Sequence, residues 1–274
     1  MKKEIRLPAS RVRSAEVKNS EKWLGYLIGL VAVSGVFLLL FANFVRVATK
    51  ETTEAMYVIS QMVVLAIYIG ILVFWAASVY DRIVNRIVRR YLITLVGLMM
   101  IWMLMRALRH TVFYHVFPIG QWCWYAYYIG MIFIPQVCLM TAKYIGKPEN
   151  YRLSKKWYLL YIPSMSLVIG ILTNDLHQWA FRFHLGYEVG WDIYQRSFLY
   201  YAAVVWIFGC IALMIAELVS NCRVPKANKM FWLPIAMLGL GVAYSVLYAF
   251  DTSLFSFIEM TAALCFTVVA IWES

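Results

Sequence analysis

Seven polar side chains are the candidates for a binding site, because each lies in or beside a long apolar segment. They are Arg106, Arg109, His110, Asn174, Asp175, His177 and Glu259. An ionisable group is costly to place in an apolar environment, so its presence there points to a function. We therefore predict that these residues line one ligand pocket.

The first three candidates share one face of a helix, since Arg106, Arg109 and His110 are spaced i, i+3 and i+4. A guanidinium presents a fixed fork of donors, which suits a carboxylate or another anion. The alternative is that both arginines extend to lipid headgroups without binding a ligand. Glu259 is the expected ion-pair partner of Arg106 or Arg109.

The histidines and cysteines lack the spacing of a metal site. His110, His115, His177 and His184 lie far apart in sequence, and the five cysteines form no CxxC pair. We therefore predict no metal and no cofactor, and the absence of a nucleophilic triad or a phosphate loop predicts no catalytic residue. Because histidine titrates near physiological pH, the four could form a pH-responsive surface or simply a solvated one.

A polar and aromatic loop over residues 174–195 contains Asn174, Asp175 and His177. Acidic and basic side chains alternate there with tryptophan, phenylalanine and tyrosine. Such a loop is either an aromatic belt at a membrane interface or the lid of a pocket. The belt is the commoner case, and the polar turn at Asn174–His177 adds support for the lid.

The composition indicates what positions these residues. The 274-residue chain is 63% hydrophobic and only 14% charged, against about 45–50% and about 25% in soluble domains. Its mean hydropathy of +0.71 excludes a soluble globular enzyme and a disordered chain. Long unbroken apolar runs indicate membrane helices and not a transmembrane barrel.

Eight apolar runs predict an all-α, polytopic membrane bundle of about eight helices. The runs cover roughly 23–45, 56–80, 91–113, 121–145, 157–173, 197–219, 230–249 and 254–272. We divide the chain into a basic arm, 1–22, and a transmembrane bundle, 23–274. The fifth run is short and contains Pro163.

Basic residues predict the orientation of the bundle. Of the 25 Lys and Arg residues, most lie in the arm and in alternate connections, around 82–90, 143–156 and 223–229. The positive-inside rule then places both termini in the cytoplasm. Because topology explains the net charge of +11, no nucleic-acid partner is predicted. The segment 81–90 alternates apolar and arginine faces, which predicts a short helix at the inner leaflet.

Several motifs resemble the N-terminal seven-transmembrane region of bacterial sensor histidine kinases. The similarity covers about 90–274 and is carried by the following segments: Tyr128–Pro135 (YIGMIFIP), Gly146–Leu153 (GKPENYRL), Tyr161–Pro163, Leu172–His177 (LTNDLH) and the closing Ile271–Ser274. The count of eight helices departs from seven by one extra helix at the N-terminus. The chain ends where its last helix reaches the cytoplasm, and it contains no phospho-acceptor helix pair and no ATP-binding domain.

This resemblance implies a sensor in the bacterial plasma membrane, working as a homodimer. It would detect a small-molecule or membrane signal and pass it through the last helix to a cytoplasmic kinase module or partner. Kinase activity would need residues beyond 274 or that partner. The alternative is a small-solute transporter or channel, although its usual signature, polar groups near the midplane, is scarce here.

Overall fold

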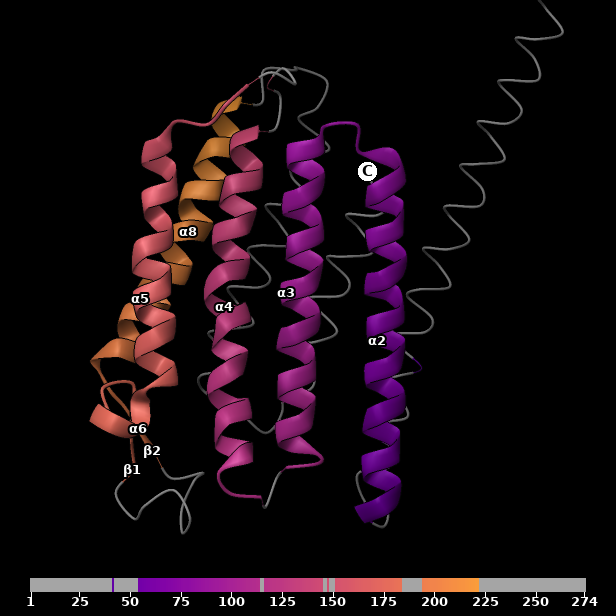
Figure 1. Ribbon diagram of the computed structural model, residues 1–274, viewed down its shortest axis with the longest axis vertical. Helices are drawn as coiled ribbons and strands as arrows, with labels where there is room; N and C mark the ends of the chain where they lie inside the picture. Colours follow the sequence, from indigo (N-terminus) through magenta and orange to yellow (C-terminus); the bar gives the residue numbers. More distant parts are fainter. Residues whose placement is uncertain are drawn as a thin grey trace, which may run out of the picture.

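The computed structural model describes residues 54–113, 116–144, 151–183 and 194–221, together with the single residues 41 and 147. This part of the chain is a helical bundle whose long helices run side by side (Figure 1). The predicted arm, 1–22, and the predicted runs 23–45, 230–249 and 254–272 lie outside the described residues.

Four of the helices are long and apolar enough to cross a membrane. They are α2 (Glu54–Arg82), α3 (Arg86–His110), α4 (Ile119–Tyr144) and α8 (Phe198–Asn221). Each coincides with one of the predicted apolar runs, so four of the predicted helices are confirmed as long and apolar enough to span a membrane. Each helix satisfies its own backbone hydrogen bonds, as a segment surrounded by lipid must.

The connection between α2 and α3 differs from the prediction. Residues 81–90 do not form a separate helix at a membrane surface, because α2 continues to Arg82 and α3 begins at Arg86. Asn85 ends the connection as an N-cap, and its side chain accepts hydrogen bonds from the N–H groups of Ile87 (3.0 Å) and Val88 (3.3 Å). The alternating pattern therefore reflects two helix ends and a capped turn.

The predicted fifth helix is two shorter pieces. A 3₁₀ helix, η1 (Lys155–Leu160), leads into α5 (Tyr161–Leu172), and α5 is not among the four helices that could span a membrane. Pro163 lies in the first turn of α5, where its missing N–H costs least. Its ring is incompatible with an α-helix that continues unbroken from residue 155.

A small sheet adds strands that the all-α prediction omits. After α5 come a single helical turn, α6 (Asn174–His177), and two antiparallel strands, β1 (Phe181–Phe183) and β2 (Tyr194–Arg196). Phe181 pairs with Arg196, and Phe183 pairs with Tyr194. The amide N–H groups of Ser197 and Leu199 donate to the carbonyls of Ala180 and Trp179, which joins the start of α8 to the residues before β1.

Helix α4 is central and packs against α3, α5 and α8 (Figure 1). Its closest approach is to α3, where a Cβ placed on Gly130 would lie 2.6 Å from the Cβ of Trp102. Only glycine permits this separation, so Gly130 brings the two helix backbones together. One buried cluster joins α2 to α3, and a second joins α4 to α5, α8 and Phe181.

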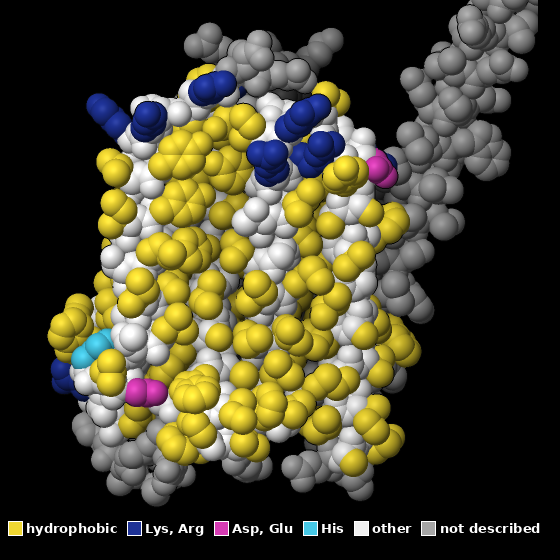
Figure 2. Space-filling view, viewed as in Figure 1, with side chains coloured by type: hydrophobic (Ala, Val, Ile, Leu, Met, Phe, Trp, Pro, Cys, Tyr) yellow, Lys and Arg dark blue, Asp and Glu magenta, His cyan; other side chains and the backbone are white. Residues whose placement is uncertain are grey.

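The two ends of the bundle differ in their charged side chains. Figure 2 shows Lys and Arg gathered at one end of the drawn face, while His lies near the other end. We call the first end, which holds the α2–α3 connection and η1, the basic end. The other end, which holds α6 and the small sheet, is the distal end.

Candidate functional site

A hydrogen-bonded group of four side chains joins α4 to α6 at the distal end. The Tyr125 hydroxyl accepts hydrogen bonds from Gln121 Nε2 (2.8 Å) and Asn174 Nδ2 (3.1 Å), and it donates to Asp175 Oδ1 (2.9 Å). Gln121 Nε2 also donates to the same Asp175 oxygen. We call Gln121, Tyr125, Asn174 and Asp175 the distal network. Asp175 is its exposed member, whereas Gln121, Tyr125 and Asn174 are buried.

Asn174 holds the turn between α5 and β1 in shape. Its Oδ1 accepts hydrogen bonds from the amides of Ala180 (2.9 Å) and Phe181 (3.0 Å), and its Nδ2 donates to the Phe181 carbonyl (3.0 Å). The turn needs a left-handed residue at Gln178, whose φ is 51°. Asn174 is fully buried, so these contacts replace the water that its amide loses.

His177 is tied to the same turn through both ring nitrogens. Its Nδ1 accepts a hydrogen bond from the Trp179 amide (3.0 Å), and its Nε2 lies 3.2 Å from Thr173 Oγ1. Because the Thr173 hydroxyl donates to the Ile169 carbonyl (2.8 Å), Nε2 must be the donor to it. The geometry therefore assigns a neutral ring with its proton on Nε2, which supports the turn.

Phe181 occupies the centre of an aromatic cluster beneath the distal network. Its ring is fully buried and lies 4.4 Å from Trp124, 5.4 Å from Tyr194, 5.5 Å from Tyr128 and 5.8 Å from Tyr200, measured between centroids. These rings come from α4, β2 and α8. The short strand β1 thus inserts one side chain that joins three elements.

The predicted arginine and histidine face is divided by the structure. Arg109 is 5% exposed, and its guanidinium lies over the Trp124 ring, 4.8 Å from the centroid. Arg106 is half-buried and close enough to Tyr127 for an electrostatic interaction, whereas His110 is exposed. Arg109 therefore reaches the aromatic cluster and does not extend to the surface.

The structure brings some of the predicted site residues close together. Asn174 and Asp175 meet in the distal network, His177 supports the adjoining turn, and Arg109 packs on Trp124. Glu259, the predicted partner of the arginines, lies outside the described residues, as do His115 and His184. The sequence analysis missed Gln121 and Tyr125, although an amide within an apolar run, four residues before a tyrosine, is a signal that could have drawn attention to them.

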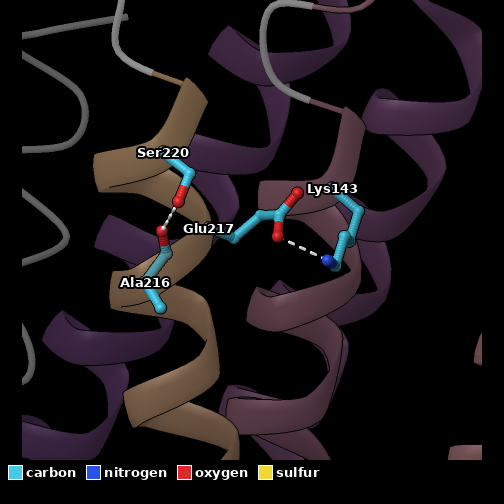
Figure 3. A network of polar contacts seen from close by, with 4 residues as sticks. All are labelled: Lys143, Ala216, Glu217 and Ser220. Atoms are coloured by element: carbon cyan, nitrogen blue, oxygen red, sulfur yellow. Dashed lines mark hydrogen bonds and ion pairs between the residues drawn. The ribbon is translucent and has the colours of Figure 1, made fainter.

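A second polar group lies at the basic end and joins α4 to α8 (Figure 3). The Lys143 ammonium donates to Glu217 Oε2 and also lies over the Trp157 ring, 3.8 Å from its centroid. We call Lys143, Glu217 and Trp157 the basic-end cluster. One turn away, the Ser220 hydroxyl donates to the Ala216 carbonyl (2.7 Å).

Between the two ends, a fully buried polar pair joins α4 to α5. The Ser164 hydroxyl donates to Gln136 Oε1, and neither residue is exposed. Helix α4 therefore has a side-chain hydrogen bond to another element at its start, about two-thirds of the way along and at its end. Hydrogen-bonding groups of this kind are suited to binding a ligand and to fixing the position of α4 relative to its neighbours. In the described part of the chain, no group of three or more His, Cys, Asp or Glu residues could hold a metal ion.

Comparisons with known proteins leave this geometry as the basis for a functional assignment. Searches against protein-family models, curated proteins and solved structures found no match.

Proposed function

We propose that the protein is the transmembrane sensing domain of a two-component-type histidine kinase or a related receptor in the bacterial plasma membrane. In this proposal the basic end faces the cytoplasm and the distal end faces outward, in keeping with the positive-inside rule. The chain crosses the membrane eight times, with η1 and α5 together forming the fifth crossing, and both termini are cytoplasmic. A homodimer passes the signal to a kinase module or partner.

The observation that carries this proposal is the pair of polar groups at opposite ends of α4. Gln121 and Tyr125 near its start belong to the distal network, and Lys143 at its end belongs to the basic-end cluster. At 26 residues, α4 is about 39 Å long at 1.5 Å per residue. One helix thus connects the group that contains the exposed Asp175 carboxylate to a contact on the proposed cytoplasmic side.

The exposed carboxylate suggests how a signal enters. A ligand with hydrogen-bond donors that binds Asp175 would compete with Gln121 and Tyr125 for the same oxygen. Release of these two side chains would free the start of α4 from α6. A tilt of about 5° over the length of α4 would then move its other end by about 3 Å, enough to separate Lys143 from Glu217.

The test compares Asp175→Asn with wild type in nanodiscs by hydrogen exchange and in cells by a phosphotransfer reporter joined to the chain. The neutral amide at 175 is a weaker acceptor for both donors than the charged carboxylate. We expect faster exchange at the basic ends of α4 and α8 and a changed reporter output. Asp81→Asn is the matched control, because Asp81 is an exposed carboxylate at the basic end.

Two results would overturn the proposal. One is unchanged exchange near Lys143 and Glu217 while the distal end of α4 exchanges faster, since the ends would then be uncoupled. The other is wild-type reporter output from Asp175→Asn protein at normal membrane levels.

One observation favours a second candidate, a small-solute transporter. The Gln136–Ser164 pair is a buried polar contact about two-thirds of the way along α4, and transporters bind substrate through polar groups inside the membrane. Solute uptake by proteoliposomes containing the protein, lost in Gln136→Leu, would support this alternative and reverse the ranking.

A further inference from the structure

Two cavities follow one another along α8, and they differ completely in chemistry. The first is polar and open to the surface, has a volume of about 540 Å³ and is lined by Tyr194, Gln195 and Arg196 of β2 and by Tyr201 near the start of α8. The second is apolar, encloses about 570 Å³ and lies between α4, α5 and α8. Together they present a polar head region and an apolar channel on one helix.

The apolar cavity follows one stripe of α8. Its lining from this helix is Ala202, Val205, Trp206, Gly209, Cys210 and Leu213, spaced by three and four residues. From Ala202 to Leu213 the axis rises about 16 Å. One leaflet of a bilayer contributes about 15 Å of hydrocarbon. The cavity is therefore as long as one leaflet is deep.

The two cavities adjoin through Tyr201 and Val205, which are one turn apart. Tyr201 lines the polar cavity, Val205 lines the apolar one, and both are exposed. A molecule that occupied both would pass over this exposed surface without crossing a helix.

The charge of the polar cavity indicates which polar group a bound molecule would place there. Arg196 is exposed, and its guanidinium is held over the Tyr200 ring, 5.1 Å from the centroid. Arg182, also exposed, lies on the neighbouring strand opposite Gln195. The charged residues described on the two strands are therefore both cations. Because a guanidinium fork matches phosphate oxygens, the cavity suits a phosphate that carries net negative charge.

We propose that this composite site binds one anionic phospholipid of the distal leaflet. Its phosphate lies at Arg196 and Tyr201, level with the headgroups beside the start of α8. One acyl chain extends along the α8 stripe toward Leu213, between α5 and α8. The site is separate from the distal network, and the proposal does not depend on the sensing function.

Gly209 permits a direct test of the acyl channel. A Cβ on Gly209 meets nothing within 4 Å, so a larger side chain enters open space and not the packed core. Gly209→Leu should therefore fill the channel without unfolding the protein. Gly70→Leu is the matched control, because Gly70 is also exposed with nothing within 4 Å of its added Cβ, but it lies on α2.

The experiment titrates the detergent-purified full chain with phosphatidylglycerol and counts bound lipids by native mass spectrometry. We expect one tightly retained lipid on wild type and on Gly70→Leu. Loss of a charged hydrogen bond in Arg196→Gln should weaken binding about tenfold or more, and overpacking in Gly209→Leu should weaken it at least about fivefold. Arg196→Lys, which keeps the charge, should bind between wild type and Arg196→Gln.

Wild-type affinity in Gly209→Leu would overturn the composite site, even if Arg196→Gln binds weakly, because the chain would then lie elsewhere. The composite site would also be overturned if inorganic phosphate displaced the bound lipid as effectively as free phosphatidylglycerol does. That result would indicate a site for a small anion. If Arg196→Gln unfolds at a lower temperature than wild type, the comparison of Arg196→Lys with wild type decides the role of the guanidinium.

Discussion

Replacement of Asn174 by alanine tests whether one side chain shapes the distal turn. The amide makes four hydrogen bonds, to Tyr125, to the Phe181 carbonyl and to the N–H groups of Ala180 and Phe181. Asn174→Ala leaves three backbone groups of this buried turn without their partner. Each such group costs about 1–3 kcal/mol, and entry of water from the nearby surface recovers part of that. We expect a loss of about 3–5 kcal/mol in the local opening free energy.

The amides of Ala180 and Phe181 report this change directly, because their protons bond to the deleted oxygen. At about 1.4 kcal/mol per factor of ten, their hydrogen exchange should accelerate roughly 100-fold to 5,000-fold in nanodiscs. Asn85→Ala is the matched control. It removes an asparagine cap at the basic end, and it should cost only about 1 kcal/mol, confined to the first turn of α3. Exchange of Ala180 and Phe181 within threefold of wild type in Asn174→Ala would refute this reasoning.

Four further substitutions test the packing around α4. Phe181→Ala empties the centre of the aromatic cluster, so it should lower the free energy of unfolding by about 3–5 kcal/mol, measured by denaturation in detergent. Gly130→Ala places a methyl group 2.6 Å from Trp102 Cβ, and the forced separation of α3 and α4 should cost about 1–3 kcal/mol and lower the thermal midpoint. Lys143→Gln and Glu217→Gln should each cost about 1–3 kcal/mol, because the remaining charge is largely buried, while the double variant should lose much less than the sum in a double-mutant cycle.

Each of these predictions has either a control variant in the same protein or an outcome that would contradict it. Phe183→Ala, in the half-buried position two residues along β1, should cost much less than Phe181→Ala. Gly97→Ala on α3 meets nothing within 4 Å and should leave the midpoint unchanged or slightly higher. Additive losses in the Lys143 and Glu217 cycle would mean that the two charges do not stabilise each other.

The long apolar helices were predictable, because about 20 consecutive apolar residues are a strong signal for a membrane-spanning helix. The run 121–145 corresponds to α4 within two residues at its start and one at its end. The run 157–173 was misread, since hydropathy does not distinguish a 3₁₀ helix from an α-helix. At 81–90 an amphipathic pattern arose from two helix ends, which a pattern alone cannot separate from one helix.

The distal network was only half predictable for a different reason. Asn174 and Asp175 are polar residues in a loop and drew attention by type. Gln121 and Tyr125 lie 54 and 50 residues before Asp175, and no local spacing encodes a contact at that distance. Arg109 stands out in the sequence as a charge within an apolar run, and in the structure its guanidinium lies over the Trp124 ring. An attraction between a cation and a ring face leaves no charge pattern in the sequence.

The turn closed by Asn174 has a consequence for the order of folding. Its bonds to Ala180 and Phe181 span only six and seven residues, and loops of about ten residues close within about 10–100 ns. The turn can therefore form before any two long helices meet. Helices α4 and α8 then assemble around this preformed turn, with the Phe181 side chain already positioned to pack between them. This short local segment acts as a template that sets the register between helices from distant parts of the chain.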